Sequence, residues 1–201
     1  MFAVWMKSWI EQYLKEQSRA ALSLPVAEIQ KWIGLLSDAR ERGSQVFACG
    51  NGGSAANCSH FATDLGKGAS GIVAGKPTAD ESVKRFRVMS LNDNLPWIGA
   101  LANDCSYDDV YVEQLKNFGR KDDVFIGVSV SGNSPNVVKA LEWAGSAGLI
   151  TLALVGNKTG NKMSKLAKHV ISVDSGHYGR VEDSQMHVLH LLCYAFIENQ
   201  A

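Results

Sequence analysis

The stretch CGNGGSAANCSHFATDL, residues 49–65, passes from the end of an apolar run through three glycines into a helical pattern. A second stretch, VSVSGNSPNVVKALEWA at residues 128–144, passes from an apolar run through serines and a glycine into another helical pattern. Turns of this kind lie at the carboxyl edge of a parallel sheet, where ligands of α/β proteins bind. The two stretches therefore predict an α/β fold with a ligand site at one edge of its sheet.

Outward from these two turns, short apolar runs alternate with helical patterns. The alternation predicts a doubly wound, five-stranded parallel sheet flanked by helices, because parallel strands need helical crossovers. The predicted strands are residues 46–49, 86–91, 124–130, 150–155 and 170–173. The predicted helices are residues 55–65, 96–118 in one or two pieces, 136–147, 162–168 and 180–199.

Two further helices are predicted ahead of the sheet. The first carries apolar residues at helical spacing, including Trp5 and Trp9, so it needs an apolar partner in its own domain or in another subunit. Pro25 begins the second helix and Gly43 ends it. The expected organisation is a single domain, residues 1–201, with a helical pair at 1–43 and an α/β core at 44–201.

The composition narrows the possible functions. The chain has 201 residues, of which 46% are hydrophobic and 20% charged, and its formal net charge is zero. Without a basic field, the protein is not expected to bind nucleic acid or an anionic membrane. The apolar stretch at the N-terminus is short and runs into charged residues, so we expect neither a signal peptide nor a membrane span. Four cysteines without a CxxC pair favour a reducing compartment, and we expect a cytoplasmic protein.

Both turns are suited to hold an anion. In the first, three glycines let the backbone approach a ligand closely, and Ser54 is expected to cap the following helix. The second turn offers three serine hydroxyls ahead of a helix start, which makes a phosphate cradle from neutral donors. Neither turn has the Gly-Lys-Ser/Thr of a phosphate-binding loop or the glycine spacing of a dinucleotide site, so no nucleotide cofactor is expected.

The two stretches resemble the signature segments of the sugar isomerase (SIS) family, and within it they look most like phosphoheptose isomerases. The resemblance extends to Ala102-Asn103-Asp104 and to RVEDSQMHVLHLLCYAFIE at residues 180–198. It implies an aldose–ketose isomerase that converts sedoheptulose 7-phosphate to D-glycero-D-manno-heptose 7-phosphate by enediol proton transfer. It also implies a homo-oligomer, a tetramer with shared active sites.

The resemblance implies roles for individual residues as well. Asp64 and His190 would be the acid and base of the proton transfer. Zn²⁺ would be held by His60, Asp64, Glu182 and His190. Asp104 would come from a neighbouring subunit. The residues expected to bind the phosphorylated sugar are Asn51, Gly52, Gly53, Ser54, Asn103, Asp104, Ser129, Val130, Ser131, Ser134 and Glu182.

Elementary chemistry supports the acid–base set independently. His60 and Asp64 are spaced i, i+4 and share a helix face, while His190 lies on another helix beside its apolar stripe. Moving a proton between adjacent carbons needs a base and an acid, which a carboxylate and an imidazole supply. Two histidines with two carboxylates can also hold Zn²⁺. Taken alone, a histidine on a helix is more often structural than catalytic.

Three positions depart from the phosphoheptose isomerase pattern. Asp64 stands where the family has glutamate, Glu182 where it has glutamine, and Lys67 is the candidate substitute for an arginine. Residues 66–84 are rich in glycine, serine, alanine and lysine, and fit a functional mobile loop and a solvated insertion equally well. These differences leave a related sugar phosphate open as the substrate.

An alternative function is a non-catalytic SIS module that binds a sugar phosphate, or a protein partner such as a replication initiator or regulator. Such a module would be expected to have lost His190 or Asp64, and this chain keeps both.

Overall fold

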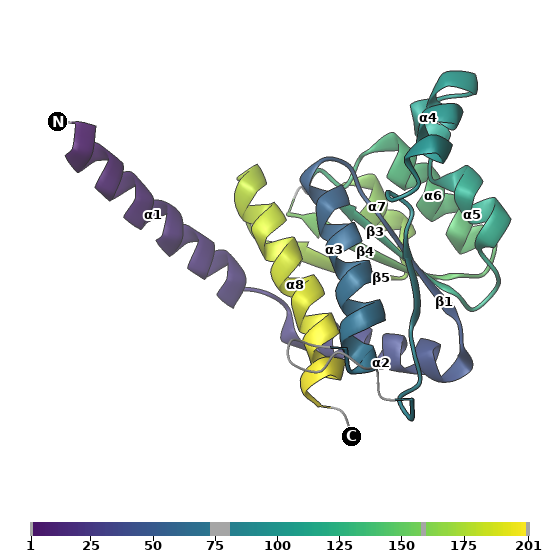
Figure 1. The fold of residues 1–201 in the computed structure, drawn as a ribbon. Helices are drawn as coiled ribbons and strands as arrows, with labels where there is room; N and C mark the ends of the chain where they lie inside the picture. Colours follow the sequence, from purple (N-terminus) through teal and green to yellow (C-terminus); the bar gives the residue numbers. More distant parts are fainter. Residues whose placement is uncertain (1, 73–80, 158–159, 200–201) are drawn as a thin grey trace.

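The computed structural model describes residues 2–72, 81–157 and 160–199. Its centre is a five-stranded sheet in the order β2-β1-β3-β4-β5, in which every neighbouring pair is parallel (Figure 1). The doubly wound parallel sheet is therefore confirmed, and each predicted strand lies within one residue of its observed bounds. The strands are β1 (Gln45–Cys49), β2 (Arg87–Ser90), β3 (Val124–Ser129), β4 (Ile150–Gly156) and β5 (His169–Val173).

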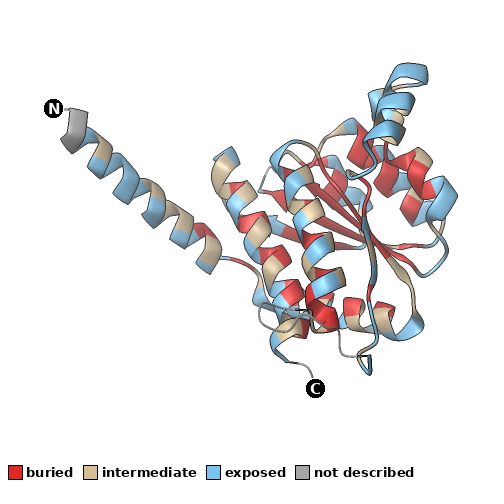
Figure 2. Cartoon of the chain, viewed as in Figure 1, coloured by how far each residue is buried: buried red, intermediate tan, exposed pale blue. Residues whose placement is uncertain are grey.

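Helices cover both faces of this sheet. Side chains alternate along each strand, so Val46 and Ala48 of β1 join one apolar layer while Phe47 and Cys49 join the other. Figure 2 shows the strands buried between the layers, which is why they are nearly continuous apolar runs in the sequence. One layer is formed by α2 (Val26–Arg42), α3 (Gly53–Lys67) and α8 (Tyr178–Glu198), and the other by α5 (Val112–Phe118), α6 (Pro135–Ser146) and α7 (Lys162–Leu166).

The helical pattern over residues 96–118 forms two separate helices. α4 (Leu95–Asp104) and α5 are joined through the 3-10 turn η2 (Tyr107–Asp109). α4 buries none of its residues and stands away from the sheet (Figures 1 and 2). The side-chain oxygen of Asn94 caps it by accepting a hydrogen bond from the Trp97 amide at 3.2 Å.

The predicted loop over residues 66–84 is wrong at its start. Gly66 and Lys67 complete α3, and the 3-10 turn η1 (Gly68–Ser70) follows directly. The helix continues because its last turn packs against α8, and a side chain at Gly68 would lie 2.8 Å from Ile197. Residues 73–80 of this segment lie outside the described residues.

The first helix, α1 (Phe2–Leu22), extends away from the sheet and meets the rest of the chain along α8 (Figure 1). Its outer face is apolar, since Trp5, Trp9, Ile10 and Leu14 are each between 44% and 59% exposed. The predicted helix is confirmed, and its aromatic face is largely exposed to solvent. None of the described helices is both long enough and apolar enough to cross a bilayer.

Candidate active site

A cavity of about 130 Å³ opens where both signature turns meet the start of α8. It lies beyond the carboxyl ends of β1 and β3, the edge at which parallel sheets bind ligands. Every residue of its lining except Tyr178 was expected from the sequence to bind the sugar phosphate. The lining residues are Asn51, Ser54, Ser129, Val130, Ser131, Ser134, Tyr178 and Glu182.

The serine turn after β3 gathers its hydroxyls on one side of this cavity. The Ser129 hydroxyl is hydrogen-bonded to that of Ser134 at 2.9 Å and lies 3.4 Å from that of Ser131. The backbone at Gly132 has φ 62°, and a side chain there would collide with Asn161 at 2.4 Å. Because α6 begins directly after Ser134, the positive end of its dipole faces the cavity, which suits a phosphate.

The glycine turn after β1 is locked to the serine turn by a pair of carboxamides. Asn51 donates to Asn136 at 2.9 Å and accepts from it at 2.9 Å, and Asn136 is buried. Tyr111 donates to the Gly50 carbonyl and is also 3.2 Å from the Asn51 side-chain oxygen. Burial raises the pKa of the Tyr111 phenol, so this hydroxyl remains a donor. Asn51 is therefore held in place on two sides.

The sequence predicts that Ser54 caps α3, and this prediction is wrong. The cap position is Gly52, with φ 55°, and it makes no side-chain cap hydrogen bond. Ser54 lies inside the first turn of α3, where its hydroxyl donates to the buried Gln185 side chain at 3.0 Å. The hydroxyl is drawn to Gln185 because α8 packs against the start of α3, so its first role is to join the two helices.

Glu182 extends from α8 over the amino end of α3. A side chain at Gly53 would lie 2.6 Å from the carboxylate carbon of Glu182, so only glycine permits this close approach. The amino end of a helix stabilises a carboxylate. The same carboxylate lines the cavity with the serines, and no lysine or arginine does so among the residues described.

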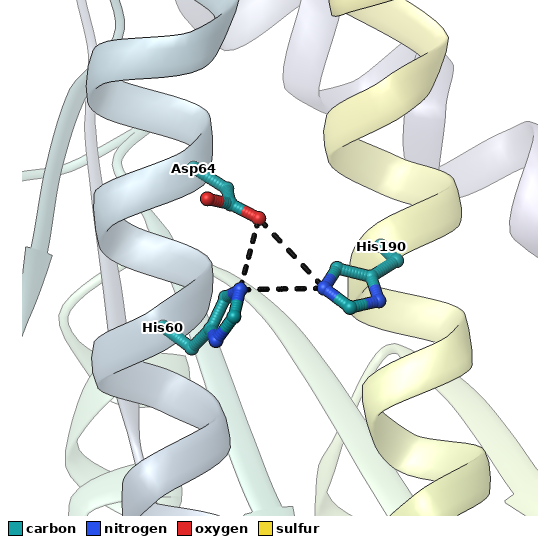
Figure 3. Close-up of side chains that lie close together, drawn as sticks. All are labelled: His60, Asp64 and His190. Atoms are coloured by element: carbon teal, nitrogen blue, oxygen red, sulfur yellow. Dashed lines mark hydrogen bonds and ion pairs between the residues drawn. The ribbon is translucent and has the colours of Figure 1, made fainter. Parts of the chain in front are cut away.

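Farther along the same two helices, His60, Asp64 and His190 converge on one point (Figure 3). The Nε2 atom of His60 is 3.1 Å from Oδ2 of Asp64 and 3.3 Å from Nε2 of His190. His190 Nε2 is 3.7 Å from the same carboxylate oxygen. The potential ligand atoms all lie within 4.8 Å of one another, and the three side chains are partly exposed. Two imidazole nitrogens and a carboxylate fit the ligand preference of Zn²⁺.

Glu182 lies apart from this cluster. It precedes His190 by eight residues on α8, which corresponds to a rise of about 12 Å along the helix. The cluster found among the described residues does not include it. Within one chain, Glu182 therefore belongs to the cavity, and its role as a metal ligand stays a prediction.

Asn103 and Asp104 lie at the exposed end of α4. The Asn103 side chain donates to Asp104 at 2.8 Å, and neither residue lines the cavity described above. The turn η2, which contacts α4, carries Tyr107, whose hydroxyl donates to Asn51 at 3.3 Å. Their assignment to the sugar site, with Asp104 reaching a neighbouring subunit, stays a prediction.

Comparison with protein families assigns the chain. A model described as the SIS domain matches residues 11–156. The chain belongs to the SIS domain family. It is similar to the phosphoheptose isomerase of Helicobacter pylori strain P12, with 34% identity over 179 residues that cover 89% of this chain and 88% of the relative. It is also similar to phosphoheptose isomerase 1 of Campylobacter jejuni, with 31% identity over 193 residues and 96% of both chains covered.

A solved SIS domain structure agrees over nearly the whole fold. The phosphoheptose isomerase of Neisseria gonorrhoeae superposes with a TM-score of 0.83 at 25% identity, covering 96% of this chain and 99% of that one. The phosphoheptose isomerase of Francisella tularensis superposes with a TM-score of 0.81 at 20% identity, which supports the fold alone.

Sequence reasoning missed several residues that shape this SIS domain site. Asn136 lies within the quoted serine stretch, but its partner Asn51 is distant in sequence, so no local pattern shows the pair. Tyr178 could have been found, since it precedes Glu182 by four residues and must share its face of α8. Tyr111 gave no signal, because a buried tyrosine next to an apolar residue such as Val112 is an ordinary core residue.

Proposed function

We propose that this SIS domain protein is an aldose–ketose isomerase that converts sedoheptulose 7-phosphate to D-glycero-D-manno-heptose 7-phosphate. The observation that carries the proposal is the His60–Asp64–His190 cluster. It lies on α3 and α8, and both helices begin at the cavity lined by the serine turn. The phosphoheptose isomerases to which the chain is similar support the choice of substrate. A module kept only for binding would not need an acid and a base held together.

The proposed chemistry divides the work between the two parts of the site. The serine turn and the start of α6 bind the phosphate, while Asn51 and Glu182 accept hydrogen bonds from sugar hydroxyls. Asp64 and His190 form the acid–base pair: one takes the proton from C1 of the ketose while the other protonates the C2 carbonyl oxygen, giving the enediol. Return of a proton to C2 and loss of the O1 proton complete the aldose.

The direct test incubates the full chain with sedoheptulose 7-phosphate in deuterated water. We expect a heptose 7-phosphate carrying deuterium at C2, and no reaction of unphosphorylated sedoheptulose. If the protein binds the sugar phosphate but neither forms the aldose nor exchanges its C1 protons, the isomerase proposal is wrong and the binding module is favoured.

We also propose Zn²⁺ as the metal of the three-residue cluster. Catalytic zinc sites use three protein ligands and keep a position open for substrate, and the nitrogen and carboxylate donors present here fit that pattern. When bound, the ion would polarise the oxygens on C1 and C2, and Asp64 and His190 would then serve as its ligands, so they would exchange protons with the substrate directly only in the metal-free site. Equilibrium dialysis against Zn²⁺ should show one site per chain in the wild type and a loss of affinity in His60→Ala. Equal retention by both would contradict the assignment.

For the assembly, we propose a homotetramer with shared active sites. The exposed aromatic face of α1 and the unburied helix α4, which carries Asn103 and Asp104, support it. Closed symmetry would cover both surfaces. Light scattering at micromolar concentration should give four times the chain mass, and a monomer would contradict it.

The structure and composition also support proposals for the cellular location, the domain organisation and the partners of the protein. We propose a cytoplasmic location, because Cys49, Cys58 and Cys193 are buried as free thiols and Cys105 is free as well. We propose that residues 1–201 act as one domain, since the helical pair and the sheet share the packing of α8. The neutral net charge supports the expectation that the protein binds neither nucleic acid nor membranes.

A further inference from the structure

The first two turns of α8 present two faces with different neighbours. Tyr178 and Glu182 line the proposed sugar-phosphate cavity, and Tyr178 also lines an adjoining cavity of about 170 Å³. Arg180 and Ser184 lie on another face and contact α1. A small rotation or shift of this helix end would therefore move cavity residues and α1 contacts together.

The contact with α1 is made by directional interactions. Glu16 is paired with Arg180 at 2.5 Å, and the guanidinium carbon of Arg180 lies 4.8 Å from the ring centre of Tyr13. The Tyr13 ring meets His177 edge-on, with 5.6 Å between ring centres. One helix face of α1 thus holds the start of α8 through an ion pair, a cation–π contact and an aromatic contact.

Two features indicate that this contact fixes the relative position of α1 and α8. A Cβ atom at Gly179 would lie 2.9 Å from the Tyr13 hydroxyl, so a larger residue there would displace the Tyr13 side chain from its present position. The Arg180 side chain is only 17% exposed, and its Nε atom has no hydrogen-bond partner within the described structure. An apolar contact would hold the two helices together without the free-energy cost of desolvating charged groups. The ion pair therefore contributes a fixed geometry between the helices.

We infer that Arg180 is a positioning residue for the sugar-phosphate cavity. Anchored by Glu16 and Tyr13, it fixes the first turns of α8 and so sets where Tyr178 and Glu182 stand in the cavity lining. The outer face of α1 is also the proposed surface for assembly of the oligomer. Assembly through α1 would therefore help to hold the cavity residues of α8 in position. The inference rests on the proposed function of that cavity as the substrate site.

The test compares Arg180→Ala, Glu16→Ala and the double variant with the wild type. The matched control is Lys116→Ala, which removes an exposed ion pair with Glu113 on α5, away from the cavity. We expect each single variant to raise KM and the dissociation constant for sedoheptulose 7-phosphate roughly ten-fold, with kcat within a few-fold of wild type. The double variant should be no worse than either single one, because both remove the same anchor. Arg180→Lys, which keeps the charge, should recover part of the affinity.

A second measurement does not depend on the proposed chemistry. Backbone amides of residues 178–185 should exchange with deuterated water faster in Arg180→Ala than in the wild type, while those of α5 should not change. Affinity for inorganic phosphate should stay near that of the wild type in the same variant, because the serine turn holds the phosphate. Unchanged exchange in residues 178–185, or a lower melting temperature with unchanged KM, would overturn the positioning role. Absence of turnover in the wild type would refute the isomerase proposal but leave the exchange result as the test of Arg180.

Discussion

The side chains of Asn51 and Asn136 form a reciprocal carboxamide pair, each donating to the other at 2.9 Å. The pair joins the glycine turn after β1 to the first turn of α6. It places the Asn51 amide at the wall of the cavity, between Tyr107 and Tyr111. The two signature turns therefore behave as one rigid unit.

Breaking this pair should loosen the unit. Asn136→Ala removes one partner and leaves the Asn51 amide without its buried partner, which should lower the free energy of unfolding by about 1–3 kcal/mol. KM for the sugar phosphate should rise as well, because Asn51 loses its fixed orientation. Denaturant unfolding and steady-state kinetics measure the two effects. Asn117→Ala on the exposed side of α5 is the control, and equal stability of the two variants would contradict the role of the pair.

Removal of either member of the acid–base pair should slow the chemistry without releasing the phosphate. A positioned acid or base contributes about 10²–10⁴-fold in rate, so His190→Ala and Asp64→Asn should reduce isomerisation by that order. His187→Ala, an exposed residue on the same helix, should be near wild type. The measurement is proton exchange at C1 of the ketose in deuterated water, alongside binding of inorganic phosphate.

Two further outcomes show whether each residue has the proposed role. If either exchanges the C1 proton as fast as wild type, that residue is not the base. If Asp64→Glu, which restores the side chain expected in phosphoheptose isomerases, retains activity while Asp64→Asn loses it, the carboxylate itself is required.

The serine turn should account for recognition of the phosphate. Ser131→Ala removes one donor to a charged ligand and should weaken sugar-phosphate binding by about 1–3 kcal/mol. Unphosphorylated sedoheptulose should bind far more weakly than its phosphate. Calorimetric titration checks both, with Ser146→Ala at the far end of α6 as control. Equal affinity of the wild type for the two sugars would mean that the turn is structural.

His169 should make the fold less stable as the pH falls. Its side chain is buried on β5, and burial together with Lys31 lowers its pKa despite Glu28 at 3.5 Å; Lys168 acts in the same direction as Lys31. The unfolded histidine titrates near pH 6.5. Between that value and the lower folded pKa the unfolded chain binds more protons, so stability decreases as pH drops through this window and is unaffected above it.

Denaturant unfolding from pH 7.5 to 5 measures this effect. The decrease should be smaller in His169→Gln, and also smaller in Lys31→Gln, because that change removes a charge that disfavours the imidazolium. If both variants lose stability with pH as steeply as the wild type, another group is responsible.

The sequence is sufficient to predict the sheet and the two turns because both depend on local pattern. Apolar runs indicate buried strands, and glycines or serines at their ends indicate ligand turns. Long-range contacts carry no such signal, as the Asn51–Asn136 pair and the hydrogen bond from Ser54 to Gln185 illustrate. Helical spacing separates Glu182 from His190 by about two turns of α8, and the assignment of both to one metal site stays a prediction.

The lining of the cavity formed by the two signature turns contains no lysine or arginine, and this has a consequence for how a substrate arrives. Among the residues that line it, the serines and Asn51 are uncharged and Glu182 is the single ionisable carboxylate, with no cation to attract a dianion from a distance. Long-range steering, which dissolved ions screen over about 8 Å at physiological ionic strength, therefore contributes little to encounter. The lining itself therefore gives no charge-based preference for a dianion, and discrimination depends on hydrogen-bond geometry after contact.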